Sequence, residues 1–370
     1  MKEVSTRCIG LDVHKETIVV AIADPEQPPV NYGTIANEPN AIRKLVRQLG
    51  EGKSLSVAYE AGPTGYCIQR QLTELGVECQ VVAPSLIPRK AGDRVKTDQR
   101  DAIMLARLLR SGDLTAVWVP GPEDEALRDL VRARFDAKAD LLRAKHRLSK
   151  FLLRQGLRPP AGARAWSAKY RAWLNQLSFP FMTSRVVFDD YRAVVAATDE
   201  RVRRLEVQLL QCGQESRQAA LIAALQTLRG VGFIAAVTIA AEAGDLRRFH
   251  SAPAFMAFTG LVSSEYSSGQ SRRQGGITHT GNSSIRHVLV QAAHNARRMP
   301  HRSWAQLHRQ EGLPPDLIDL GWKAQTRLHM RYRHLAARIG VPKTVTAVAR
   351  ELAGFVWAIG QRMNEEVAAG

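Results

Sequence analysis

Short apolar runs rich in β-branched residues alternate with helical patterns through the first quarter of the chain, and this alternation most constrains the fold. Residues 8–23 read CIGLDVHKETIVVAIA, two β-rich runs around a polar DVHKET, which predicts a hairpin or two strands of a sheet. Residues 55–59 and 78–83 predict further strands, and residues 40–49 and 67–75 predict helices. Such alternation is typical of an α/β layer with a mixed sheet.

Acidic residues stand where several of these elements begin or end. Asp12 lies near the end of the first strand, Glu60 ends another, and Asp98 and Asp101 share one face at the start of a predicted helix. Taken singly, each acid is explained as a cap, a dipole partner or half of an ion pair. Four converging carboxylates would repel one another unless a cation neutralised them. Oxygen ligands favour Mg²⁺ or Mn²⁺ over zinc, so the combination indicates a divalent metal site.

Two long charged helices are predicted in the middle of the chain, beyond a boundary at Pro120 and Pro122. Residues 123–155 keep near-heptad spacing, although basic side chains interrupt the seam. Residues 188–212 follow a Gly/Pro break and predict the second helix. The pair forms either an antiparallel coiled-coil arm or two ordinary bundle helices. The predicted domains are 1–120, 121–215 and 216–370, and the last is mainly helical.

The last part of the chain contains a glycine hairpin and a serine-rich loop. Gly230 and Gly232 join two predicted helices, which looks like a helix-hairpin-helix unit whose backbone approaches a phosphate. A plain helical hairpin with glycine at the helix stop explains the same pattern. Residues 263–282 read SSEYSSGQSRRQGGITHTGN, a flexible loop of the kind that often carries function.

The charge balance indicates a polyanionic partner. The 370 residues include 52 Lys and Arg against 35 Asp and Glu, a net charge of +17, which is typical of nucleic-acid-binding proteins. Arg272, Arg273 and Arg286 are candidates for phosphate contact, and otherwise they form a solvated basic face. Four cysteines without a CxxC pair fit a reducing compartment. With no signal peptide or membrane-spanning run, we expect a cytoplasmic, nucleoid-associated bacterial protein.

Several motifs resemble the DEDD transposases of insertion sequences, and more narrowly the insertion-sequence one-ten family. GLDVHK at 10–15, YEAGPTGY at 59–66 and VKTDQRDA at 95–102 are similar to the family's first domain, which is like the resolvase RuvC and has an RNase H-type fold. LRGVGFIAAVTIAAEAGDLRRF, AFTGLVSSEYSSGQSRRQGGITHTGN and ARELAGFVWAIG are similar to its transposase domain and C-terminal end. The resemblance covers nearly the whole chain apart from the helical arm.

The resemblance implies a bridge-RNA-guided DNA recombinase. The family's four metal-binding acids correspond to Asp12, Glu60, Asp98 and Asp101. The implied cofactor is Mg²⁺ or Mn²⁺, and the implied partners are donor and target DNA, a structured guide RNA, and further copies of the chain in a dimer or tetramer. Sequence specificity would then lie in the guide RNA rather than in contacts between protein and bases.

The family's nucleophilic serine lies in the loop that reads SSG here, at Ser267 or Ser268, and Ser268 is preferred for its distance from the GGIT segment. A serine hydroxyl is a weak nucleophile and needs activation, so the resemblance implies that it reaches the metal pocket of the same chain or of a partner subunit. Attack on phosphorus would give a phosphoserine–DNA intermediate and strand exchange without ATP. Ser263 and His279 depart from the family's frequent Pro and Lys, which loosens the loop and weakens the case for a cation there.

Three other functions are compatible with parts of the sequence. A RuvC-type endonuclease or resolvase would use the same acids with water and would need no serine. GLDVHK also resembles the first phosphate segment of actin-like sugar kinases, but no later Gly-rich phosphate and adenosine loops stand in a suitable place. A non-catalytic nucleic-acid-binding module would fit the charge, yet it would not need the four acids.

Overall fold

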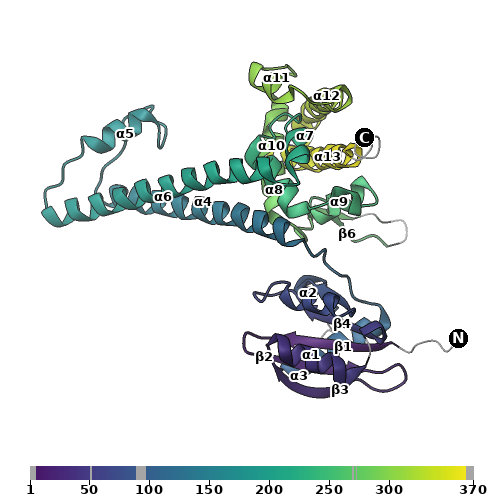
Figure 1. Cartoon of the computed structure of the whole chain (residues 1–370). Helices are drawn as coiled ribbons and strands as arrows, with labels where there is room; N and C mark the ends of the chain where they lie inside the picture. The colour runs from purple at the N-terminus through teal and green to yellow at the C-terminus, as the bar shows by residue number, and fades with distance from the viewer. Residues whose placement is uncertain (1–5, 51, 89–96, 269–270, 272, 364–370) are drawn as a thin grey trace. The chain divides into compact units, whose positions relative to one another are not determined.

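The computed structural model describes residues 6–50, 52–88, 97–268, 271 and 273–363 (Figure 1). The chain divides into two compact units, Met1–Val119 and Pro120–Gly370. The first unit holds a five-stranded mixed sheet, and helices dominate the second. This agrees with the predicted α/β first part and the predicted mainly helical last part of the chain. The further division of the second unit into 121–215 and 216–370 stays a prediction.

A mixed sheet forms the centre of the first unit, with strand order β3-β2-β1-β4-β5. β1 pairs antiparallel with β2, and β2 with β3, whereas β1 and β4, and β4 and β5, are parallel. Parallel neighbours need a crossover, and a helix lies in each crossover here. The strands are β1 (Arg7–Val13), β2 (Thr17–Ala23), β3 (Val30–Ala36), β4 (Leu55–Glu60) and β5 (Glu78–Val82). The crossover helices are α1 (Pro39–Leu49), followed by the 3₁₀ turn η1 (Gly52–Ser54), and α2 (Cys67–Glu74).

The two faces of the sheet carry side chains of different size. Large side chains such as Leu11 and Tyr59 pack on one face with Ile42 of α1 and Leu72 of α2. The other face is lined by small residues, which pack against α3 (Asp98–Ser111). Successive side chains of a strand point to opposite faces, so residue parity alone decides which helix each strand residue meets.

β1 and α3 approach each other most closely at Gly10. A Cβ atom at Gly10 would lie 2.1 Å from the carbonyl oxygen of Ala102 and 2.5 Å from the amide nitrogen of Ala106. Only glycine leaves room for the helix backbone at that point. The contact seats the first turn of α3 beside the end of β1.

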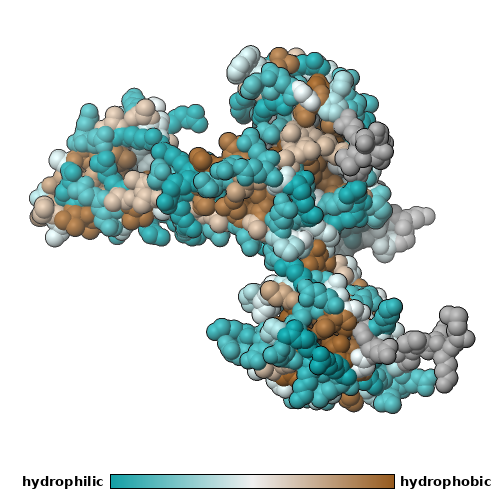
Figure 2. Space-filling model, in the orientation of Figure 1, coloured by the Kyte–Doolittle hydropathy of each residue, from teal (hydrophilic) through white to brown (hydrophobic). Residues whose placement is uncertain are grey.

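A pair of long helices begins the second unit. α4 (Pro122–Arg154) and α6 (Met182–Glu215) lie side by side, with α5 (Ala168–Asn175) beside their far end (Figure 1). Leu141 of α4 and Val202 of α6 are buried between the long helices. At 1.5 Å per residue each is about 50 Å long. Both predicted helices are present and form an arm, but its coiled-coil character stays a prediction. Apolar patches interrupt the hydrophilic surface of the arm (Figure 2), and Leu142 and Val207 are among its exposed apolar side chains.

In the second unit the buried helix α8 (Phe233–Ala243) packs against α4, α7 (Ala219–Leu225) and α10 (Ser283–Ala293). Val237 and Ile239 of α8 are fully buried in the largest apolar core of the chain. Among the described residues no helix has the length and apolarity that a bilayer crossing requires. The remaining 3₁₀ turns are η2 (Pro84–Leu86) in the first unit, and η3 (Leu246–Arg248) and η4 (His294–Arg297) in the second. The other elements are α7 (Ala219–Leu225), α8 (Phe233–Ala243), α9 (Ala252–Phe258), β6 (Ser263–Glu265), β7 (Gln274–Ile277), α10 (Ser283–Ala293), α11 (Trp304–Gln310), α12 (Pro315–Ile339) and α13 (Val341–Arg362).

The contact at Gly10 predicts a selective cost for one added methyl group. Gly10→Ala is expected to lower the free energy of unfolding of the first unit by about 1–3 kcal/mol, because the methyl group meets backbone atoms that cannot rotate away. Gly62→Ala is the matched control, since its Cβ would meet only the carbonyl oxygen of Glu60, at 3.9 Å. Chemical denaturation followed by circular dichroism measures both. Equal stability of the two variants would contradict the close seating of α3.

Candidate metal centre

Asp12 and Glu60 lie on neighbouring parallel strands and face the same helix. The last paired residues of β1 and β4 are Leu11 and Tyr59, so Asp12 and Glu60 follow side by side. Leu11 and Tyr59 belong to the core on the α1 and α2 face. Since side chains alternate along a strand, Asp12 and Glu60 point to the opposite face, toward α3.

The other two predicted acids stand in the first turn of α3. Thr97 caps this helix, its hydroxyl oxygen accepting a hydrogen bond from the amide of Arg100 at 3.4 Å, as its sequence position predicts. Asp98 and Asp101 follow within one turn. The positive end of the helix dipole stabilises carboxylates there.

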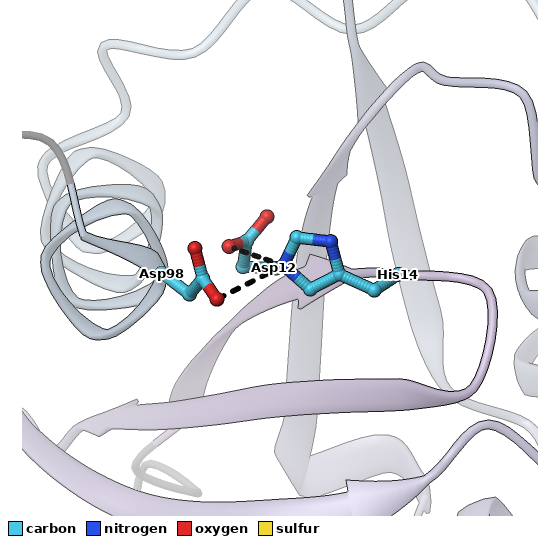
Figure 3. Close-up of side chains that lie close together, drawn as sticks. All are labelled: Asp12, His14 and Asp98. Carbon is cyan, nitrogen blue, oxygen red and sulfur yellow. Dashed lines mark ion pairs between the residues drawn. The ribbon is translucent and has the colours of Figure 1, made fainter.

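Asp12 and Asp98 converge on an imidazole that the sequence analysis does not single out (Figure 3). The Nε2 atom of His14 lies 3.2 Å from a carboxylate oxygen of Asp12 and 3.3 Å from one of Asp98. One ligand atom from each of the three residues lies within 4.8 Å of the others. The turn that carries His14 is itself fixed, because its amide donates to the carbonyl of Thr17 at 2.9 Å and its carbonyl accepts from the side chain of Asn37 at 2.8 Å.

The charge environment of Asp12 is that of a crowded acidic site. Partial burial raises the pKa of Asp12, and contact with His14 opposes this shift. The negative charges of Asp98 and Asp101 raise the same pKa further. Asp101 is therefore close enough to act on Asp12, although it is outside the tight group of three. A divalent cation would relieve this repulsion, because it favours the ionised form of every neighbouring carboxylate.

The donor set fits a divalent metal ion. Two carboxylates and one imidazole lie within ligand distance of a common point, and Asp98 and His14 are accessible from solvent. The sequence predicted a site with oxygen ligands only, and the structure adds the nitrogen of His14 as a candidate ligand. An imidazole nitrogen suits Mn²⁺ better than Mg²⁺. The motif DVHK places His14 two residues after Asp12, but β1 ends at Val13, so strand alternation alone does not predict the side on which His14 lies.

The predicted serines lie on the hairpin of β6 and β7 in the second unit. Both are exposed. The hydroxyl of Ser267 donates to a carboxylate oxygen of Glu265 at 2.8 Å. Ser268 pairs through its backbone with Ser271, at 3.1 and 3.0 Å. The carboxylate contact is made by Ser267 alone, so the preference for Ser268 rests on the sequence.

The predicted nucleic-acid contacts have mixed surroundings. Gly230 adopts a φ of 88°, and a Cβ there would lie 2.6 Å from the carbonyl oxygen of Ala292, so packing inside the protein already requires glycine. Gly232 is the N-cap of α8. Arg286 donates to the carbonyl of Thr259 at 2.8 Å. Arg273 is exposed, and Arg272 lies outside the described residues.

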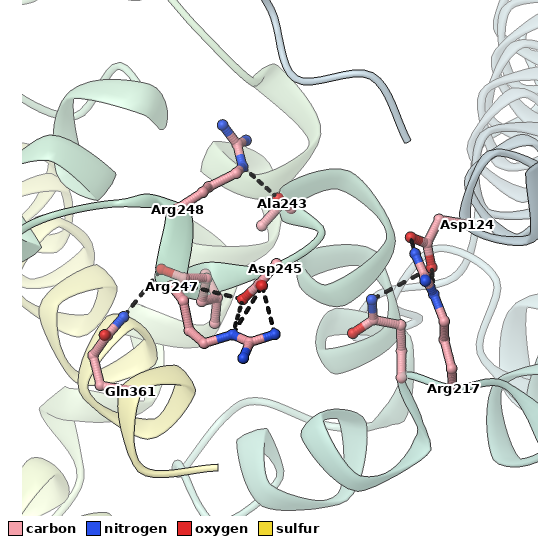
Figure 4. Close-up of polar contacts among 9 residues, drawn as sticks. Asp124, Arg217, Ala243, Asp245, Arg247, Arg248 and Gln361 are labelled. Carbon is pink, nitrogen blue, oxygen red and sulfur yellow. Dashed lines mark hydrogen bonds and ion pairs between the residues drawn. The ribbon is translucent and has the colours of Figure 1, made fainter. Parts of the chain in front are cut away.

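Buried charges elsewhere in the second unit have partners and are explained by structure. Asp124 in α4 is 2% exposed, and Arg217 donates to it from Nε at 2.8 Å (Figure 4). Glu242 in α8 is similarly buried, and it accepts from Arg132 at 2.8 and 3.1 Å and from Asn282 at 2.7 Å. Paired buried charges of this kind hold helices together, and removing one partner is costly.

The crowding of the acids yields a prediction about protonation. In the metal-free protein, Asp98→Asn is expected to lower the pKa of Asp12, because it removes a neighbouring negative charge that favours the protonated form. Asp113→Asn, which removes an exposed carboxylate just beyond the other end of α3, is expected to leave that pKa unchanged. Carboxyl-carbon NMR during a pH titration measures both. An unchanged pKa in Asp98→Asn would show that the two carboxylates do not interact.

Comparisons with known proteins place both units in one family. A model of DEDD transposases of the IS110 type matches residues 9–155, and a model described as the transposase IS116/IS110/IS902 family matches residues 222–309. All four predicted acids lie within the first match. Both candidate serines lie within the second.

Full-length relatives agree with these matches. A putative transposase of Sinorhizobium fredii is 44% identical over 362 residues, which cover 96% of this chain and 89% of the relative. The transposase for insertion sequence element IS1533 of Leptospira borgpetersenii is 31% identical over 331 residues, covering 88% and 96%. A probable family 20 transposase of Pseudomonas aeruginosa is 28% identical over 294 residues, covering 77% and 82%. The chain belongs to the IS110/IS116/IS902 family of transposases.

Proposed function

We propose that this transposase cleaves and exchanges DNA strands with a divalent metal ion bound at Asp12, Asp98 and His14. The observation that carries the proposal is the convergence of these three side chains from a strand end, a helix start and the intervening turn. The five-stranded mixed sheet that positions them is consistent with an RNase H-like fold. Glu60 and Asp101 face the same region and complete the acidic set.

The protein residues have separable tasks in this reaction. Asp12 and Asp98 supply the negative charge that holds the ion, and His14 supplies a nitrogen donor. Glu60 and Asp101 offer further carboxylates for a second ion. When bound, the metal neutralises charge on the scissile phosphate and stabilises the attacking and leaving oxygens. Partial burial of Asp12 strengthens its interaction with a cation, because the local dielectric constant is lower than that of water.

The nucleophile is a serine of the β6–β7 hairpin, with Ser268 preferred over Ser267. Its oxygen attacks phosphorus, one bridging P–O bond breaks, and the leaving oxygen takes up a proton. One phosphodiester bond replaces another, so exchange needs no ATP. For Ser267, the contact with Glu265 offers an acceptor for the hydroxyl proton.

We base the proposed partners, which are DNA, a guide RNA and further copies of the chain, on the family resemblance and on the chemistry of the surface. A guide RNA and DNA both suit a net charge of +17. Exposed apolar side chains on the arm, among them Leu142, Leu153, Val186 and Val207, suit contact with a further copy of the chain in a dimer or tetramer. Gly232 at the start of α8 and Arg273 on the hairpin remain our candidates for phosphate contact.

Substitutions of the proposed ligands test whether they bind the metal ion. Asp12→Asn and Asp98→Asn are each expected to abolish detectable Mn²⁺ and Mg²⁺ binding in isothermal titration calorimetry. His14→Ala is expected to weaken Mn²⁺ binding by about 10-fold or more and Mg²⁺ binding less, because it removes a nitrogen donor. Asp113→Asn serves as the charge-matched control. Wild-type affinities in Asp12→Asn would exclude this site.

Loss of the metal ligand Asp12 tests whether the proposed site takes part in strand cleavage. On DNA that carries the gene's own flanking sequences, supplied with RNA transcribed from them, Asp12→Asn is expected to reduce metal-dependent strand cleavage on the order of 10²–10³-fold. Quantitative gel analysis of cleaved strands measures the rate. Cleavage at the wild-type rate would contradict a catalytic role for the acids.

Substitutions of the hairpin serines separate serine attack from hydrolysis by water. Ser268→Ala is expected to abolish a covalent protein–DNA adduct on denaturing gels, whereas Ser271→Ala, on the same hairpin, keeps it. If Ser267→Ala loses the adduct and Ser268→Ala keeps it, the nucleophile is Ser267. Persistent cleavage without any adduct in the double variant would favour a RuvC-type hydrolytic nuclease.

A further inference from the structure

A groove in the second unit runs between the serine hairpin and α13. Its wall on one side is β7 with the turn after it, and on the other the end of α12 and the first half of α13. The cavity has a volume of about 660 Å³. All of its lining residues belong to one compact unit, so its shape does not depend on how the two units are arranged.

The groove combines an apolar floor with basic side chains. Leu261, Ile277 and Ala347 contribute apolar surface, and Lys343 and Arg350 of α13 contribute positive charge. Among the described residues, no Asp or Glu lines the groove. Within the described part of the chain, no hydrogen bond or ion pair engages the side chains of Lys343 and Arg350. Their charges are therefore available to an anionic ligand.

The basic surface continues beyond the groove onto α12, which packs against α13. A second hollow shares Arg350 and Ala347 with the first and is also lined by Arg327 and Arg331. Glu351 lies there too, but it is engaged by Arg327, and Arg331 lies 3.8 Å from it. In this second hollow three arginines, two on α12 and one on α13, stand against one glutamate. An extended polyanion fits this arrangement better than a single small anion.

The wall formed by β7 is open at one residue. A Cβ at Gly276 would meet no heavy atom within 4 Å, and its φ lies outside the left-handed region. At Gly275 the same addition would lie 2.4 Å from the hydroxyl oxygen of Ser264. Gly276 therefore exposes backbone to the groove without being required for packing. A phosphate or sugar lying in the groove would meet this exposed backbone rather than a side chain.

The turn after β7 is held in an unusual backbone conformation. His279 lines the groove and has a φ of 56°, in the left-handed region that non-glycine residues seldom adopt. Two flanking hydrogen bonds hold it, from the amide of Thr278 to the carbonyl of Val262 at 2.9 Å and from that of Asn282 to Phe258 at 2.8 Å. Such strain persists where the surrounding structure over-determines it, and it clusters at functional sites.

We propose that this groove binds a single DNA strand, with Lys343 and Arg350 on its phosphates and the apolar floor against its sugars and bases. The proposal rests on the proposed function, because it supplies the strand that the hairpin serine attacks. The cavity has the size of about one or two nucleotides, and strand-tracking sites elsewhere combine a basic groove with aromatic side chains that stack bases, a surface that aliphatic side chains provide here. DNA is the chosen occupant because the groove wall is the hairpin of a DNA transposase.

The test uses the full chain without metal, so that no catalysis is needed. A fluorescein-labelled 20-nucleotide DNA strand is titrated in EDTA at several salt concentrations, and anisotropy gives the dissociation constant. Lys343→Ala with Arg350→Ala is expected to weaken binding at least 10-fold and to reduce the salt slope by about 1.4, at about 0.7 per lost phosphate contact. Lys323→Ala with Arg333→Ala removes the same charge from exposed positions on α12 and is expected to change the slope little.

A steric variant gives an independent readout. Gly276→Val keeps all charges, suits a β-strand and fills the open wall, so it is expected to weaken strand binding with an unchanged thermal unfolding midpoint. Equal effects of the groove and α12 pairs, or full binding by Gly276→Val, would overturn the proposal. Tighter binding of the same sequence as RNA, lost in the same variants, would overturn it in favour of RNA. Adduct formation by Ser268→Ala reports on the nucleophile alone. The strand-binding measurement does not depend on that result, so the two proposals can fail separately.

Discussion

The close contact between β1 and α3 at Gly10 is the constraint on which the candidate centre depends. A helix that packs directly against a strand backbone can move little along it without steric overlap, so the first turn of α3 is held beside the end of β1. Asp98 therefore meets Asp12 without any direct bond between them. Packing at Gly10, on the α3 face of the sheet that also carries Asp12, keeps the two like-charged carboxylates close, and a bound cation would reduce their repulsion.

Much of the sheet was predictable because its central strands are buried and strongly patterned. β1, β2, β4 and β5 correspond to the predicted runs, and α3 begins at the predicted cap. β3 was missed, because its sequence VNYGTIA is mostly exposed and lacks a continuous apolar face. α5 was also missed. Its short apolar pattern follows a Gly/Pro break and is stabilised by Tyr170 and Leu174 packing onto distant helices, which local sequence does not reveal.

Two of the four predicted acids, Asp12 and Asp98, lie together in the candidate site, whereas its third member, His14, was not predicted. Strand ends and a capped helix start explain why Asp12, Glu60, Asp98 and Asp101 stood out. His14 follows the strand end, and its orientation depends on a turn closed by Thr17 and Asn37, so its contact with two carboxylates needed the structure. Gly230 shows the reverse case, because the glycine that suggested a phosphate contact is required by packing against Ala292.

The parallel pairing of β1 with β4 has a consequence for how the enzyme tolerates sequence change. Asp12 and Glu60 extend from adjacent backbones, and backbone hydrogen bonding holds such neighbours about 4.8 Å apart whatever the side chains are. Their separation is a property of the polypeptide itself. Substitutions in the surrounding core can alter stability or solubility while the spacing of these two backbone positions stays the same.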